Sequence, residues 1–218
     1  MRIAFLIVLA AGCGGTSAKY TVDDVALATV PVSEKQAIFN AQNQVSVAKA
    51  DQQKALADAD ATDHDLDIAK TEKEQARLET SKARLEADAA DKSHDQNKID
   101  TAARMKKAAD AGEQAADAKV DWLSQVKKWH RAQADAAEAQ VSLANAQVEL
   151  EKAKLAELKK IKPSPDFKLQ TFTDEYQRRQ GKADSAKKDA DSAKASADKL
   201  EQTSKDLAQQ ATQLKAAK

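Results

Sequence analysis

The feature that most constrains the fold is a seven-residue repeat in residues 169–214. Small and apolar residues recur there by alternating steps of three and four. One row of the repeat is Leu169, Tyr176, Ala183, Ala190, Ala197, Ser204 and Ala211, and the other is Phe172, Arg179, Ala186, Ala193, Leu200, Leu207 and Leu214. A strict seven-residue spacing keeps one face of a helix turned toward a partner helix. The repeat therefore predicts a coiled-coil helix, interrupted on its apolar face only by Arg179 and Ser204.

The same repeat runs through residues 33–162, which we expect to form two long arms. Its core rows in the first arm are Ile38, Val45, Gln52, Ala59 and Leu66, and Ala41, Ala48, Ala55, Thr62, Ala69, Ala76, Ala83 and Ala90. Alanine at nearly every turn lets two backbones approach closely, although each alanine buries little apolar surface. Residues 33–36 read Ser-Glu-Lys-Gln, a capping box that predicts the start of the first helix at Ser33.

Two positions qualify for the turn between the first and second arms. Residues 91–98 place polar groups on both core rows and contain a second capping-box pattern, from Ser93 to Gln96. Residues 110–113 contain Gly112, the one glycine between the N-terminal region and Gly181. The seven-residue register continues through residues 91–97 without a slip, so the two turns are close to equal, with a slight preference for the first.

The second arm is apolar on two opposite sides, which predicts a helix with a neighbour on each side. One face carries Val120, Leu123, Ala134, Ala137, Val141, Ala144, Val148, Leu155 and Leu158, and the other carries Trp122, Trp129, Ala136, Leu143 and Leu150. Pro163 and Pro165 then break the chain, with Ser164 or Thr173 as the start of a third arm within residues 163–218. We therefore predict an all-α fold of long antiparallel coiled-coil helices, folded back into a three-helix bundle.

The N-terminal residues have the pattern of a secretory signal. Arg2 precedes an apolar run at residues 3–11, which small residues and Cys13 follow. The run is shorter than the ~20 residues that a membrane-spanning helix needs. We therefore expect residues 1–12 to be a signal peptide and residues 13–32 to be a tether and linker. Cys13 is the only cysteine, so the chain cannot form an internal disulfide.

Residues 9–13, Leu-Ala-Ala-Gly-Cys, resemble the lipobox of bacterial lipoproteins. Ala10 stands where that family usually has leucine, and Leu9 is one place early. The resemblance implies cleavage before Cys13 and attachment of lipid, such as palmitate, to its sulfur and its amino group. Gly14 follows the cysteine where family members retained at the inner membrane carry aspartate. The resemblance thus implies anchoring in the inner leaflet of the outer membrane, facing the periplasm.

Composition and motifs predict neither an enzyme nor a nucleic-acid binder. The chain has 35 basic and 35 acidic residues, so no net charge attracts it to nucleic acid. Its five glycines form no phosphate loop, and its carboxylates lie on solvated faces where little raises a pKa. His64, His94 and His130 are far apart in sequence, and we interpret His130 as an ordinary helix residue. We expect no catalytic residues, no metal and no cofactor.

The whole plan resembles the alanine-rich coiled-coil lipoproteins of the bacterial envelope, of which murein lipoprotein is the best-known type. The resemblance rests on residues 9–13, the seven-residue repeats and the terminal Lys218. In that type the terminal lysine is joined to peptidoglycan, which makes Lys218 a candidate attachment site. The resemblance predicts a non-enzymatic, lipid-anchored spacer or scaffold that self-associates through its coiled coils. Residues 139–150 also resemble the helices of efflux adaptors, so an accessory subunit of an efflux or secretion complex is the alternative.

Overall fold

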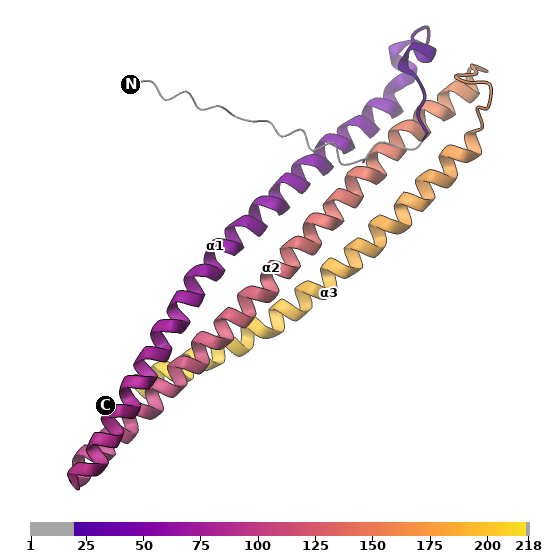
Figure 1. The fold of residues 1–218 in the computed structure, drawn as a ribbon. Coiled ribbons are helices and arrows are strands. Elements are labelled where there is room, and N and C mark those ends of the chain that lie inside the picture. The colour runs from indigo at the N-terminus through magenta and orange to yellow at the C-terminus, as the bar shows by residue number, and fades with distance from the viewer. Residues whose placement is uncertain (1–19, 217–218) are drawn as a thin grey trace, which may run out of the picture. The chain divides into compact units, whose positions relative to one another are not determined.

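Three long helices make up most of the computed structural model, which describes residues 20–216 (Figure 1). They are α1 (Gln36–Ser93), α2 (Gln96–Leu158) and α3 (Leu169–Ala216), and two short 3-10 helices, η1 (Asp24–Leu27) and η2 (Val32–Lys35), precede them. Helix α2 contacts both α1 and α3, and residues 20–216 contain no strand. The predicted all-α fold is confirmed, and so is the place of the second arm as the middle helix. Cys13 and Lys218 lie outside the described residues.

The described chain forms two compact units, each built from parts of all three helices. The first unit contains residues 20–45 and 141–179, and the second contains residues 46–140 and 180–216. The helices thus pass from one unit into the other, whereas the boundaries of the predicted arms follow the turns between helices.

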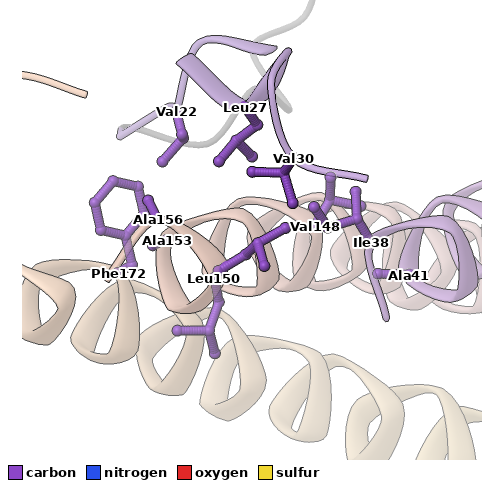
Figure 2. Close-up of a cluster of buried hydrophobic side chains, with 11 residues drawn as sticks. Val22, Leu27, Val30, Ile38, Ala41, Val148, Leu150, Ala153, Ala156 and Phe172 are labelled. Carbon is purple, nitrogen blue, oxygen red and sulfur yellow. The ribbon is translucent and has the colours of Figure 1, made fainter. Parts of the chain in front are cut away.

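The first unit holds the larger apolar core. It joins the N-terminal segment, which we define as residues 20–30, to the start of α1, the end of α2 and the start of α3 (Figure 2). The buried members are Val22, Leu27, Val30, Ile38, Ala41, Val148, Leu150, Ala153, Leu155, Ala156 and Phe172. Large side chains from several segments meet here, so this core buries more apolar surface per residue than an alanine seam does.

The second unit is packed mainly through alanine and a few larger residues. Leu66 and Ala69 of α1 pack against Leu123 of α2, with Val120 and Trp122 beside them. Thr80 is 2% exposed, and its hydroxyl donates a 3.2 Å hydrogen bond to the backbone oxygen of Ala109 in α2. Without that hydrogen bond, burial of the Thr80 hydroxyl would destabilise the fold.

Ion pairs cross from α1 to α2 along the second unit. Lys73 lies 2.8 Å from Asp117, and the pairs Arg77–Glu113, Arg84–Asp110, Lys119–Glu72 and Lys127–Asp63 follow the same antiparallel register. Most of these side chains are partly exposed, where a pair contributes only ~0–1 kcal/mol. Their main effect is to favour this alignment of the two helices over alignments that are shifted along the helix axis.

Helix α3 buries the face that its repeat predicts. Ala183, Ala190, Ala197, Ser204 and Ala211 are each no more than 8% exposed. The leucines of the companion row, Leu200, Leu207 and Leu214, are only partly buried. The seam is therefore formed chiefly by small residues, with the leucines along its edge.

The chain turns between α1 and α2 at His94 and Asp95, within the first of the two predicted positions. His94 adopts a left-handed backbone conformation with φ of 54°. The Asp95 carboxylate accepts hydrogen bonds from the amides of Asn97 and Lys98, at 3.1 and 3.4 Å, and so caps α2. Gly112 lies inside α2, so no turn forms at residues 110–113.

Some predicted helix ends differ from those in the structure. Ser33 lies inside η2, where Pro31 holds the N-cap position without a side-chain hydrogen bond. The Ser93 hydroxyl donates to Ala90 instead of capping α2. Helix α3 begins at Leu169, between the two predicted starts. Short capping patterns are common in polar chains, and tertiary packing decides which of them is used.

Candidate functional site

The most elaborate arrangement of side chains lies where the N-terminal segment docks on α2 and α3. Val22, Leu27 and Val30 are only 2%, 2% and 6% exposed. Figure 2 shows their side chains pointing down toward α2. Phe172 of α3 lies below Val22 in the same view. The Asp23 carboxylate accepts a 3.0 Å hydrogen bond from the Val25 amide and so caps η1. The segment is thus folded onto the helices and is no longer free to act as a flexible linker.

Polar contacts reinforce this docking. The backbone amide of Val22 donates a 2.7 Å hydrogen bond to the carboxylate of Glu149 in α2. The amine of Lys152, one turn further along, lies 2.7 Å from Asp24 and 3.2 Å from Glu149. Lys152 therefore connects a charge on the N-terminal segment to a charge on α2, and its own side chain is only 9% exposed.

Lys152 remains charged in this setting. Burial acts to lower its pKa, but hydrogen bonds to Asp24 and Glu149 and their negative charges together raise the pKa above its ordinary value. A lysine acts as a nucleophile or base only after it loses its proton. The arrangement thus favours an ionic fastening of the segment over chemistry at the amine.

The start of α3 carries a second buried carboxylate, Glu175, which is 7% exposed. Arg178 donates to it at 2.6 and 2.9 Å, and Arg179 donates to it at 2.8 Å. Arg179 also donates to the hydroxyl of Ser142 in α2. These contacts explain how an arginine fits into the apolar row of α3: its guanidinium is paired on its own helix and bonded to the neighbouring one.

The hydrogen bond from Arg178, followed by that from Arg179, lowers the pKa of Glu175 from 4.5 to about 2 despite burial of the carboxyl group. A depressed pKa means that the carboxylate stabilises the fold above the unfolded pKa. That contribution is lost as the pH falls toward 2. We expect the first unit to lose ~2 kcal/mol of stability between pH 4.5 and 2, less than the full shift implies because half-exposed Arg178 is screened by solvent.

Amide hydrogen exchange of residues 141–179 across this pH range measures that loss. The matched variant Glu175→Gln, which cannot titrate, should start less stable at pH 6 and show a flatter pH dependence. An equal slope in the two proteins would mean that Glu175 does not carry the effect.

The histidines stay on separate parts of the structure. His64 is in α1, His94 is in the turn, and His130 is in α2, where its ring stacks on Trp129 with centroids 4.5 Å apart. The amine of Lys194 in α3 lies 5.6 Å from the centre of the Trp129 ring, a cation–π contact. His130 thus takes part in aromatic packing in the second unit.

Two further observations concern residues 20–216. No group of three or more histidine, cysteine, aspartate or glutamate side chains among them is arranged to hold a metal ion. None of the helices described there is apolar over a length that could cross a membrane.

Sequence reasoning singled out Cys13 and Lys218, which lie outside the described residues. It missed the docked N-terminal segment and the charges that hold it, because residues 20–30 have no regular apolar period. One signal for the Glu175 cluster was present. Arg179 interrupts an apolar row, and Glu175 stands four residues before it, the spacing at which helical side chains pair.

Comparison with known proteins found no similar protein. No protein-family model matches the chain, and neither the curated proteins nor the solved structures include a detectable match.

Proposed function

We propose that the protein is a non-enzymatic spacer or scaffold of the bacterial envelope, anchored by lipid on Cys13 to the outer membrane. The observation that carries the proposal is the docked N-terminal segment. Residues 14–19 separate Cys13 from Tyr20, and the ring of Tyr20 lies 6.2 Å from that of Phe172 in α3. At most ~25 Å of extended chain lies between the two residues. A lipid on Cys13 would hold the first unit close to the membrane surface.

Helix length supports a spacing role. Helix α2 has 63 residues, which correspond to ~95 Å at ~1.5 Å per residue. Both α1 and α3 contact it. A long helix in contact with two other helices is typical of structural coiled-coil proteins, which favours a spacer or scaffold.

The buried charges also favour a structural role. Lys152 and Glu175 are paired with neighbouring charges in the ionic form that stabilises the fold. Catalytic acids and bases instead have pKa values near the working pH, so that they can exchange protons. We therefore infer that the first unit holds the N-terminal segment, which follows the proposed lipid anchor at Cys13.

The anchor is tested by fractionation of cells that produce the Cys13→Ser protein. Without the thiol, lipid cannot attach and the signal should stay uncleaved, so a longer precursor should replace the mature protein in the outer-membrane fraction. The control Ser17→Ala changes the same tether and should fractionate like the wild type. Unchanged processing and location of the Cys13→Ser protein would rule out the lipid anchor.

The partner is tested by isolation of the protein from detergent-solubilised envelope. A spacer attached to the cell wall should remain with washed sacculi until a muramidase digests them, and deletion of Lys218 should release it. A stoichiometric protein partner would instead favour an accessory subunit of an efflux or secretion complex.

A further inference from the structure

A groove runs along the hairpin end of α1 and α2, in the second unit. Its first part has a volume of ≈ 730 Å³ and begins at Leu214 and Lys215, in the last turns of α3. Its second part, ≈ 600 Å³, continues to Ser93 and Asn97 beside the turn. The two parts share Glu86, Thr101 and Met105, so they form one groove, which we call the tip groove.

The tip groove continues the path of α3. The end of the Lys215 side chain lies 3.9 Å from where a Cβ on Gly112 would be, and its amine lies 3.8 Å from Glu79, so the last turn of α3 contacts both α1 and α2. Figure 1 shows α3, in yellow, ending against these two helices before they reach the turn. Between Leu214 and the turn, the groove formed by α1 and α2 is not covered by any other helix of the described residues.

The floor of the groove suits close helix packing. It is lined by the small residues Ala83, Ala89, Ala90, Ala102, Ala108 and Ala109. Met105 also lines it and is 50% exposed, one of six large apolar side chains that the second unit leaves exposed among the described residues. A methionine is flexible and fills irregular contacts well, which suits a surface that a partner covers.

The charges on the two walls are complementary to each other. The α1 wall carries Glu79, Lys82 and Glu86, and the Glu86 carboxylate lies 3.8 Å from the Lys82 amine. The α2 wall carries Lys98, whose amine lies 3.4 Å from the Asp95 carboxylate, and Arg104, whose guanidinium donates only to the Thr101 hydroxyl, at 3.5 Å, among the described contacts. A surface with acid on one wall and base on the other matches a second copy of itself, turned by a two-fold rotation.

We propose that the tip groove takes the hairpin end of a second copy of this chain. Two hairpin ends, overlapped in opposite directions, form a four-helix bundle in which each fills the place beyond the other's α3. In that arrangement α1 of one copy runs beside α2 of the other, and Glu86 meets Lys98 or Arg104 of its partner. Met105 of each copy is covered by the alanine floor of the other.

Sedimentation of the full chain in detergent solution, over a series of concentrations, tests this. The wild type should form dimers, and Met105→Glu, which places a charge in the contact, should raise the dissociation constant by at least about tenfold. Leu85→Glu is the matched control, since Leu85 is 68% exposed on α1 and does not line the groove. It should leave the dimer unchanged. Circular dichroism of each variant checks that the helices are intact.

A charge exchange gives a second, independent readout. Glu86→Lys should weaken the dimer by repulsion, and the triple variant that adds Lys98→Glu and Arg104→Glu should restore it. A wild type that stays monomeric, or a dimer weakened equally by Leu85→Glu and Met105→Glu, would overturn the proposal. Recovery of the protein in complex with a different chain through this groove would also overturn it.

Discussion

Phe172→Ala is expected to lower the stability of the first unit by about 3–4 kcal/mol, the lower part of the range for loss of a buried phenylalanine. Phe172 is 8% exposed and joins α3 to the N-terminal segment in the core of this unit. Its ring centre lies 6.2 Å from that of Tyr20 and 5.9 Å from that of Phe167. Truncation removes both ring contacts and leaves a cavity that the long helices cannot easily close.

Amide hydrogen exchange of residues 20–45 and 141–179 measures this loss within the first unit. Val25→Ala is the control, because Val25 belongs to the same unit but is 78% exposed. The control should cost ~1 kcal/mol or less, since little buried surface is lost. Equal effects of the two substitutions would show that Phe172 does not hold the N-terminal segment in place.

Lys152→Met is expected to destabilise the docking of the N-terminal segment by about 3 kcal/mol, the lower end of the range for removing one partner of a buried ion pair. Methionine keeps most of the apolar length of the side chain, so the lost charge causes most of the effect. Among the contacts described for it, the Glu149 carboxylate, 14% exposed, would keep the hydrogen bond from the Val22 amide and lose the Lys152 amine. Exchange of the amides in residues 20–30 should become about 100-fold faster.

Two companion variants identify the source of the effect. Asp24→Asn removes the other partner of Lys152, but Asp24 is 79% exposed, so it should cost no more than ~1 kcal/mol. Glu149→Gln, added to Lys152→Met, removes the unpaired charge and should recover part of the lost stability. A double variant less stable than Lys152→Met alone would contradict a buried, charge-based fastening.

The seven-residue repeats predicted most of the fold because they record a physical requirement. A helix that buries one face must repeat its small residues every seven positions, and α3 buries the row from Ala183 to Ala211 as expected. The opposed seams of the second arm predicted its middle place for the same reason. Leu158 departs from this, since it is 74% exposed where α2 ends.

The rest depends on contacts between segments far apart in the sequence. Val22 and Glu149 are 127 residues apart, and nothing in the local pattern of either indicates the other. The two predicted turns were nearly equal because the seven-residue register runs through residues 91–97 without a slip. In the structure the Asp95 carboxylate caps α2 at the first of them. The docked N-terminal segment is short and aperiodic, so its burial follows from the core that it meets.

The central claim is that a lipid on Cys13 anchors this helical protein, and the mass of the intact mature chain tests it most directly. The protein is extracted with detergent from the membrane fraction of cells that make the full chain. We predict the mass of residues 13–218 increased by the lipid groups on the sulfur and amino group of Cys13. A mature chain in which Cys13 is unmodified would contradict the account.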